Sequence, residues 1–440
     1  MFEPVHIVTF GCQMNQQESS VMAELLSSSE FRICNSIEDA EIVILETCAI
    51  RKKAEDKVYS LLGRLKQLRK KSGLPKKIVV CGCMVTEDGA KNLVEEHGVS
   101  VVLGPRRISR IAEALHESET EPVIDISFVW ALPPYDISAP YISGVSAYVT
   151  VMQGCSNSCS YCVVPSRRGA AQSKPLRQII DEIKLLETKG YKEVILLGQN
   201  ISYFGIDKPD TPRLIDLLEI IESESRISRI RFVTSHPAFI DDKFIERLSK
   251  LRRVMPNIHL PIQSGSNRIL KAMRRGYSSE RFLELVRAFR NGNENFTINT
   301  DFIAGYDGET PADHCETLEL IEKAELDGAY AFPYSERNGT RAALTNNENS
   351  IPIIERKKRC KEILDKVKKV ALERRKRDIG RSVEVLIEAP GVGRSEGNIN
   401  VEFEGGRSNE FGIVKIKEVS SFAMCGELED NCLQEDGIEK

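Results

Sequence analysis

Short apolar runs alternate with longer amphipathic segments over residues 1–118 of the chain. The apolar runs are VHIVTF (5–10), EIVIL (41–45), KIVVC (77–81) and VSVVLG (99–104). Continuous apolar strands with helices between them are typical of a parallel sheet that is covered on both faces. We therefore expect residues 1–118 to form an N-terminal α/β domain built on a parallel sheet.

A second alternation of the same kind occupies residues 147–350. Its six apolar runs lie at residues 147–153, 193–198, 229–234, 257–263, 296–305 and 329–334. A closed (β/α) barrel needs eight strand–helix units, and its active site lies at the carboxyl ends of the strands. Six units therefore predict a partial (β/α)6 barrel with an open side that admits a macromolecule.

The remaining segments have a different composition. Residues 119–146 are proline-rich and aperiodic, which indicates a linker. The connector 351–379 contains a basic helix with one apolar stripe and twelve Lys or Arg between residues 356 and 377. This pattern fits either a solvated helix that docks through the stripe or a helix face that contacts phosphates. Residues 380–440 are β-rich with an acidic end, which predicts a small β domain and a disordered tail.

Composition narrows the class of protein. The net charge of −4 over 440 residues gives no global basic field. No run of about 18 apolar residues indicates a membrane span, and the N-terminus lacks signal-peptide architecture. We therefore expect a cytoplasmic protein, in which the 12 cysteines are thiols or metal ligands rather than disulfides. Nothing in the sequence requires more than a monomer.

Six of the cysteines have spacings that suggest metal binding. Cys155, Cys159 and Cys162 form CxxxCxxC directly after the first strand of the second alternation. Structural zinc needs four protein ligands, and a ferredoxin cluster uses a fourth cysteine, so neither fits well. A four-iron cluster on three thiolates leaves one iron open to chelate a small molecule.

The other three cysteines lie apart in the sequence. Cys12, Cys48 and Cys83 each follow an apolar strand of the N-terminal alternation. The carboxyl ends of parallel strands share one edge of a sheet, which is where ligands bind in such folds. We therefore expect these three thiols to form one shared metal site, and three cysteines fit a three-iron cluster as well as a four-iron one.

CxxxCxxC after a first barrel strand resembles the radical S-adenosylmethionine (SAM) superfamily. The resemblance implies that the cluster held by the 155–162 loop binds SAM and cleaves it to a 5′-deoxyadenosyl radical, so that its three cysteines are catalytic through the cluster. Tyr161 is then placed to stack on a ring, and residues Gly198, Gln199 and Asn200 lie where the methionine end of SAM is usually met. Weaker candidates for cofactor contacts at later strand ends are Ser235, His236, His259, Gln263 and Asp301, although a lone histidine there is more often structural.

Longer motifs make the resemblance more specific. TFGCQMNQQES, ETCAIRKKAEDKV and CGCM look like the N-terminal domain of the methylthiotransferases, and MQGCSNSCSYCVVPSRRG, LLGQN, TSHP, HLPIQSGSNRILKAMRRGY and TDFIAGYDGET resemble its tRNA-modifying branch that acts on isopentenyladenosine. The C-terminal segment is similar to a TRAM domain, an RNA-binding module. The resemblance implies an auxiliary [4Fe-4S] cluster on Cys12, Cys48 and Cys83, besides the SAM-cleaving [4Fe-4S] cluster.

The reaction implied by this family is methylthiolation at C2 of N6-isopentenyladenosine next to the anticodon of tRNA, with two SAM molecules per turnover. A C2–H bond is not acidic, which requires a radical route, and the bases of a single-stranded loop can be splayed into a pocket. The implied partners are a tRNA that carries isopentenyladenosine, an electron donor such as flavodoxin or ferredoxin, and a sulfur source.

Four short segments depart from the family pattern. ETC places Glu46 near the auxiliary site, and GYDGET places Asp307 where proline is common. VPSRRG and YSERNGT also differ, and all four departures concern details of tRNA and SAM contacts rather than the reaction class.

Two alternatives stay open at the level of sequence. A sister methylthiotransferase acts on threonylcarbamoyladenosine of tRNA or on an aspartate of a small-subunit ribosomal protein. An iron–sulfur protein that binds RNA without catalysis is the alternative from another class, and SAM cleavage would separate it from an enzyme.

Overall fold

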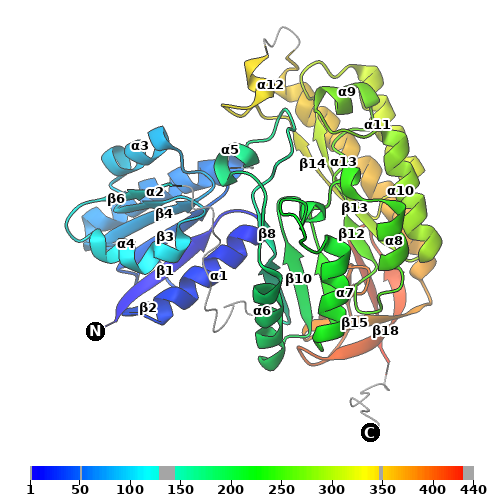
Figure 1. Cartoon of the computed structure of the whole chain (residues 1–440), viewed down its shortest axis with the longest axis horizontal. Coiled ribbons are helices and arrows are strands. Elements are labelled where there is room, and N and C mark those ends of the chain that lie inside the picture. Colours follow the sequence, from blue (N-terminus) through cyan, green and yellow to red (C-terminus); the bar gives the residue numbers. More distant parts are fainter. Residues whose placement is uncertain (1, 50–51, 128–143, 346–349, 430–440) are drawn as a thin grey trace.

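The computed structural model describes residues 2–49, 52–127, 144–345 and 350–429. In Figure 1 the N-terminal part, in blue and cyan, lies beside a larger unit in green and yellow, and the C-terminal strands lie below that unit. The multidomain α/β class expected from the sequence is confirmed.

The N-terminal part is a six-stranded sheet in which all strand pairs are parallel. Its strand order is β2-β1-β3-β4-β5-β6. The strands are β1 (Glu3–Thr9), β2 (Phe31–Ile33), β3 (Ile42–Thr47), β4 (Lys77–Gly82), β5 (Val101–Leu103) and β6 (Val123–Asp125). The four expected strands are all present, and the short strands β2 and β6 were not foreseen.

Helices cover both faces of this sheet. They are α1 (Gln13–Ser27), α2 (Lys52–Ser72), α3 (Glu87–His97) and α4 (Ile111–Glu117). One apolar layer joins α1 and α4 to the sheet, and the other joins α2 and α3 to the opposite face. Because alternate strand residues point to opposite faces, the strands are apolar throughout, as a parallel sheet requires.

The segment expected as a linker, 119–146, contains β6. Val123–Asp125 pairs with β5 at the edge of the sheet, and Arg107 and Arg110 both bind the Asp125 carboxylate, at 2.7 and 2.6 Å. The expectation of a linker from residue 119 was therefore wrong at its start, because edge pairing and two ion pairs stabilise a segment without apolar periodicity. Most of the remaining linker lies outside the described residues.

The larger unit carries the six expected strands. They are β7 (Ser146–Thr150), β10 (Glu193–Leu197), β11 (Arg229–Phe232), β12 (Asn257–His259), β13 (Thr297–Ala304) and β14 (Gly328–Pro333). Parallel pairing gives the orders β11-β10-β7 and β12-β13-β14, and the bridge from Ile230 to Val254 links the two groups. Among the described residues β7 and β14 do not pair with each other, so the barrel stays open on one side.

Helices flank this half-barrel. The main ones are α6 (Leu176–Thr188), α7 (Leu214–Glu224), α8 (Asp242–Leu248), α10 (Ser279–Gly292) and α11 (Pro311–Ala324). Shorter elements near the carboxyl ends of the strands are β8 (Met152–Gln153), α5 (Val164–Arg168), β9 (Gln172–Ser173), α9 (Asn267–Ala272) and α12 (Arg341–Leu344). One large apolar core joins the strands to the main helices.

The basic helix is α13 (Ile353–Arg375), and it packs along β14. Its stripe of Cys360, Ile363, Val367 and Ala371 is buried, which confirms the docked reading. Three of its arginines bind carboxylates of the half-barrel: Arg356 to Asp307, Arg359 to Glu309 and Arg374 to Asp327, at 2.7–2.8 Å. Much of the positive charge of α13 therefore serves docking, and Asp307, a departure from the family pattern, is one of the docking partners.

The C-terminal segment forms a closed five-stranded barrel. Its strands are β15 (Ser382–Ala389), β16 (Val392–Ser395), β17 (Asn400–Glu402), β18 (Phe411–Val419) and β19 (Ala423–Leu428). The expected acidic tail from residue 426 was placed too early, because residues 426–428 complete β19; residues 430–440 lie outside the described part.

Two buried arginines of β11 join the half-barrel to the small barrel. Arg229 donates to the carbonyl of Arg394 at 2.7 Å, and Arg231 donates to the carbonyls of Ser395 and Glu396 at 2.8 and 2.7 Å. Both side chains are about 1% exposed, and charge-assisted bonds of this kind are strong. The small barrel is therefore firmly seated at the amino ends of the half-barrel strands.

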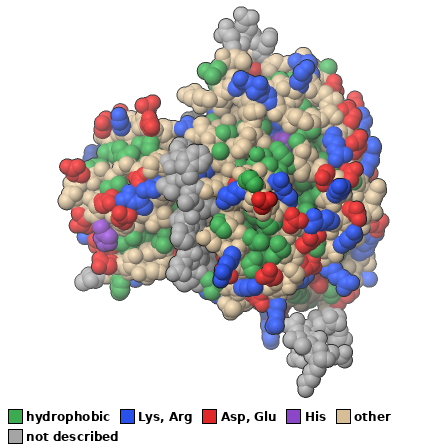
Figure 2. Space-filling view, in the orientation of Figure 1, with side chains coloured by type: hydrophobic (Ala, Val, Ile, Leu, Met, Phe, Trp, Pro, Cys, Tyr) green, Lys and Arg blue, Asp and Glu red, His purple; other side chains and the backbone are tan. Residues whose placement is uncertain are grey.

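The surface seen in Figure 2 has Lys and Arg side chains interspersed with Asp and Glu over the larger unit, so this face shows no broad patch of one sign. Among the helices of the described residues, none combines the length and apolar character that a membrane crossing requires.

Candidate functional site

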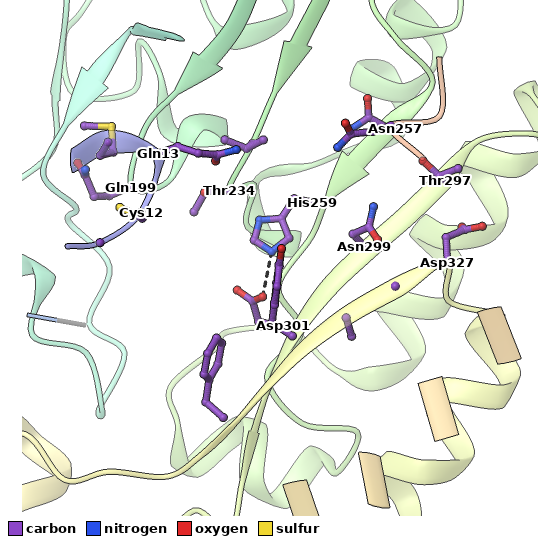
Figure 3. A pocket seen from close by; sticks show the side chains of 18 of the residues that line it. Cys12, Gln13, Gln199, Thr234, Asn257, His259, Thr297, Asn299, Asp301 and Asp327 are labelled. Atoms are coloured by element: carbon purple, nitrogen blue, oxygen red, sulfur yellow. Dashed lines mark ion pairs between the residues drawn. The ribbon is translucent and has the colours of Figure 1, made fainter. Parts of the chain in front are cut away.

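A cavity of about 860 Å³ lies where the three parts of the chain meet. Its walls come from the strand-end loops of the N-terminal sheet, the inner face of the half-barrel, α13 and two loops of the small barrel. Figure 3 shows polar side chains from β12 and β13 opposite the loop that carries Cys12. The cavity has the size of a ligand pocket, and it extends along the half-barrel from Asn257 and Thr297, the first residues of β12 and β13, to Gln199 in the loop after β10.

The three N-terminal thiols meet at this cavity. Cys12, Cys48 and Cys83 follow β1, β3 and β4, which are neighbours in the sheet, and all three line the cavity. Hydrogen bonding with Cys48, together with the charge of Arg168, lowers the pKa of Cys12 to about 6. Burial raises the pKa of Cys83 to about 12, which opposes ionisation until a cation binds. The expected convergence of these loops at one edge is therefore present.

Polar groups behind the thiols fix their loops. Asn15 on α1 accepts from the backbone N–H of Cys12 at 3.0 Å and donates to Glu46 at 2.7 Å. Glu46 is fully buried, burial raises its pKa well above the usual range, and Cys81 donates to it at 2.9 Å. Cys81 thus lies beneath the cavity wall and Cys83 lies on it, which favours Cys83 as the ligand.

Arg168 connects the two thiol-bearing parts of the chain. Its Nε donates to Cys83 Sγ at 2.8 Å, and its Nη1 and Nη2 bind both carboxylate oxygens of Glu18 on α1, at 2.5 and 2.8 Å. Arg168 lies six residues after Cys162 and its side chain is only 4% exposed. A buried cation beside a thiol stabilises its thiolate. No pattern in the sequence pointed to a role for this residue beyond the basic VPSRRG segment behind the cysteine motif.

The loop that carries CxxxCxxC is shaped by a glycine. Gly154 has φ of +75°, and a Cβ there would lie 2.2 Å from the carbonyl oxygen of Ala170. This close approach lets Cys155 donate its N–H to the carbonyl of Gly169 at 3.1 Å, and Cys162 donates to that of Cys159 at 3.2 Å. The loop is therefore folded back on itself, and its three thiols come from one continuous segment.

A buried arginine accompanies this loop as well. Arg275 donates from Nη1 to Cys159 Sγ and to Tyr161 Oη, both at 3.3 Å. Tyr161 is partly buried and packs against the apolar cluster that contains Ile269 and Met273, so the protein itself contacts its ring. Burial raises the pKa of Cys162 to about 12, and burial raises that of Cys155 too. Arg275 is a second functional candidate that sequence analysis did not identify.

Polar side-chain atoms without a hydrogen-bond partner lie in the loops after β10 and β11. Gln199 Oε1, Asn200 Nδ2 and Ser235 Oγ are buried without a hydrogen-bond partner. Buried polar groups in proteins are nearly always bonded, so these atoms point to a missing ligand. Gly198 also belongs to this edge, because a Cβ there would lie 2.6 Å from the Met152 side chain.

His236 differs from these neighbours. Its Nδ1 accepts from the N–H of Ala238 at 3.2 Å, and its ring packs edge-on against Tyr277 with 5.3 Å between centroids. Burial, and then the charge of Arg275, lower the pKa of His236 to about 2. The ring is therefore neutral and caps a turn, which favours the structural reading of this histidine.

His259 and Asp301 face the cavity as a pair. His259 Nε2 lies 3.1 Å from Asp301 Oδ1, as the dashed line in Figure 3 shows.

Two residues near this pair have an unusual backbone conformation. Gln263 has φ of +80°, and its N–H donates to the carbonyl of Asp301 at 2.8 Å, which extends the pairing of β12. Thr234, on the cavity wall, has φ of +67°. Positive φ in residues other than glycine is uncommon and clusters at functional sites.

Each thiol set has a buried arginine beside it. Arg168 donates to Cys83 and Arg275 donates to Cys159, so a cation is in place to offset the negative charge that thiolate ligands of a metal centre carry. Within the described ranges, no three or more His, Cys, Asp or Glu side chains come together as ligands of one metal ion.

Comparison with known protein families agrees with this chemistry. Residues 149–321 match the radical SAM superfamily, and residues 4–104 match a group described as uncharacterized protein family UPF0004. Among solved structures, the radical SAM methyltransferase TsrM from Kitasatospora setae is similar, with a TM-score of 0.56 and 14% identity over 78% of this chain and 77% of that one. At this identity the likeness concerns the fold alone.

Curated relatives extend over almost the whole chain. A tRNA-2-methylthio-N(6)-dimethylallyladenosine synthase of Moorella thermoacetica is 35% identical over 96% of this chain and 98% of its own length. Synthases of the same name from Bacillus velezensis and Bacillus subtilis are 39% and 37% identical, over 94% and 96% of this chain and 82% and 85% of their own lengths. The chain therefore belongs to the tRNA-2-methylthio-N(6)-dimethylallyladenosine synthase family of radical SAM methylthiotransferases.

Proposed function

We propose that this protein adds a methylthio group at C2 of N6-isopentenyladenosine next to the anticodon of tRNA. The observation that carries the proposal is the single cavity lined by three N-terminal thiols, by strand-end groups of the half-barrel and by loops of the small barrel. A sulfur-transferring enzyme needs a sulfur site that faces the same space as the target carbon. The names of the curated relatives support the same activity.

As a radical SAM protein, the chain uses SAM and a [4Fe-4S] cluster. We assign Cys155, Cys159 and Cys162 to this cluster, and the three N-terminal thiols to a second [4Fe-4S] cluster. When bound, these groups supply one-electron cleavage of SAM and a place for sulfur. Two SAM molecules are consumed per turnover in this proposal, one for the methyl group and one for the radical.

The side chains of the protein bind and orient in this scheme. The unpaired atoms of Gln199, Asn200 and Ser235 are available to the amino and carboxylate groups of SAM. His259 Nε2 lies 3.1 Å from Asp301 Oδ1 and both side chains line the cavity, so this pair is available to a base bound there. No side-chain base is required at C2, because a C–H bond of that kind is broken by a radical and not by proton transfer.

In this proposal each segment of the chain has one role. Residues 1–118 carry the auxiliary cluster, and residues 147–350 form the domain that cleaves SAM. Residues 351–379 connect that domain to residues 380–440, which form a TRAM-like RNA-binding domain. The cavity at the junction of these segments is lined by Cys12, Cys48 and Cys83 and by Val163, the residue directly after the CxxxCxxC motif, so a base bound there would lie near both thiol sets in this proposal. An electron donor such as flavodoxin or ferredoxin, a separate sulfur source, a monomeric state and a cytoplasmic location complete the proposal.

Anaerobic reconstitution tests the proposal directly. We expect about eight irons per chain, and incubation with isopentenylated tRNA, SAM and a reductant should add a methylthio group to the adenosine, detected by mass after digestion to nucleosides. Unmodified tRNA together with 5′-deoxyadenosine would instead favour a sister substrate. RNA binding without SAM cleavage would favour a non-catalytic protein, and zinc in place of iron would refute both clusters.

A further inference from the structure

Three aromatic side chains on the wall of the cavity are left exposed. Tyr330 and Phe332 on β14 are 64% and 37% exposed, and Phe422, between β18 and β19, is 68% exposed. All three line the same cavity as Cys12 and His259. Scattered exposed aromatics are ordinary, whereas several around one functional cavity mark a binding surface.

The two rings of β14 form a pair. Their centroids are 6.4 Å apart and the ring planes differ by 20°. The neighbouring Ala329 and Ala331 pack against the half-barrel core, so the alternation of the strand directs the two rings away from that core. Since β14 is the edge strand of its sheet, the pair stands at the open side of the half-barrel, on the cavity wall.

Phe422 is held in place from the other side of the same rim. Arg375 at the end of α13 donates to the carbonyls of Ser420 and Ser421, which fastens the loop of the small barrel to the helix. Lys368, two turns before Arg375 on the same side of α13, places its Nζ 5.8 Å from the Phe422 ring centroid. The aromatic surface is therefore built before any ligand arrives.

Charges on the cavity wall favour an anionic ligand. The cationic side chains among the described lining residues are Arg167, Arg168, Lys368, Arg375 and Arg394. The carboxylates there are Asp301, which pairs with His259, and Asp327, which Arg290 and Arg374 already bind. Two of the cations are also paired, Arg168 with Glu18 and Arg394 with Glu388. This excess of cations contrasts with the mixed charges on the face in Figure 2.

Aromatic faces interleaved with cations are the surface that binds single-stranded nucleic acid, since every base can stack on a ring while cations meet the phosphates. A protein segment would also cover apolar rings, but it would not explain why Lys368, Arg375 and Arg167 lie on the same wall. We propose that Tyr330, Phe332 and Phe422 form a stacking platform for the unpaired bases next to the target base, and that Lys368 contacts the phosphate between them. This inference rests on the proposed function and names the part of the site that selects an unpaired RNA loop.

The test uses the full chain with both clusters reconstituted. Dissociation constants of an isopentenylated anticodon stem-loop are measured by fluorescence anisotropy, and KM is measured with whole tRNA. Loss of one base–aromatic stack weakens binding about 5- to 150-fold. We therefore expect Tyr330→Ala and Phe422→Ala to raise Kd and KM within that range, and Tyr330→Phe to retain near-native values.

Leu344→Ala is the matched control, because Leu344 is 81% exposed and does not line the cavity. Its Kd should equal that of the unchanged protein. Iron content and unfolding temperature verify that each variant is folded, which truncation of an exposed ring should not alter.

A second RNA makes the inference specific. The second RNA is a stem-loop with abasic positions on both sides of the target base. For this RNA, Tyr330→Ala and the unchanged protein should have the same Kd. Equal effects of the substitution on intact and abasic RNA, or native affinity of both alanine variants, would overturn the platform. Failure of the unchanged protein to bind or modify isopentenylated RNA would instead overturn the proposed function, and with it the platform.

Discussion

Replacing Arg168 with methionine is the sharpest perturbation of the interface between the two thiol sites. The change removes two hydrogen bonds to Glu18 and one to Cys83 while keeping the length of the side chain. Glu18 is 1% exposed and would remain buried without its partner. Breaking a buried ion pair on one side costs about 3–5 kcal/mol, which corresponds to a fall of roughly 6–20 °C in unfolding temperature for a unit of 150–250 residues.

Two measurements follow this perturbation. Thermal unfolding of the reduced, cluster-free protein reports the lost ion pair, and an iron count after anaerobic reconstitution reports the auxiliary site. We expect the count to fall from about eight to about four irons per chain, because Cys83 loses the cation that stabilises its thiolate. Glu18→Gln added to Arg168→Met should recover part of the unfolding temperature, since it removes the unpaired charge.

Arg177→Met is the matched control for this experiment. Arg177 is 93% exposed and its contact with Asp181 measures 3.7 Å, so an exposed pair of this kind contributes little. Its unfolding temperature and iron content should not change. A native unfolding temperature in Arg168→Met, together with a full iron count, would refute the reasoning.

Three further results are expected. Cys155→Ala should abolish SAM cleavage, whereas Cys12→Ala should leave cleavage intact and abolish sulfur insertion; full methylthiolation by the second variant would exclude its role as a ligand. Gly154→Ala should lose the SAM-cleaving cluster because its Cβ would lie 2.2 Å from a carbonyl oxygen, while Gly190→Ala, with positive φ but open space, should keep it, as iron counts would show. The pKa of His236 is lowered to about 2, so only the unfolded state gains its proton as the pH falls below about 6.5, and stability falls by up to about 1.4 kcal/mol per pH unit. His236→Asn should flatten this acid limb in urea unfolding of the cluster-free protein; an unchanged slope would contradict a buried neutral ring.

Local sequence patterns were sufficient to predict the main strands and the placement of the cysteines after them. Apolar runs separated by amphipathic segments predicted all ten main strands of the two α/β parts, because a buried parallel strand must be apolar along its whole length. The position of Cys12, Cys48 and Cys83 after such strands predicted their common edge. The short strands β2 and β6 escaped prediction, since three residues at a sheet edge carry no periodic signal.

The roles of individual charged residues depended on the tertiary structure. From the sequence, the twelve basic residues in and after α13 fitted a phosphate-binding face as well as a docked helix. Only the packing of the helix revealed that Arg356, Arg359 and Arg374 bind carboxylates of the half-barrel. Arg168 and Arg275 reach their thiols across long sequence separations that no local pattern encodes.

The sequence by itself determined the main strands of the two α/β parts and the positions of the thiols after them, because periodicity and spacing are local properties of the chain. Only the tertiary structure decided which polar atoms lack partners, which cations neutralise which thiols and which aromatic rings remain exposed at the cavity. These properties depend on burial and on distances between residues such as Glu18 and Arg168, which are 150 positions apart. They arise only when the separate layers of the fold pack together.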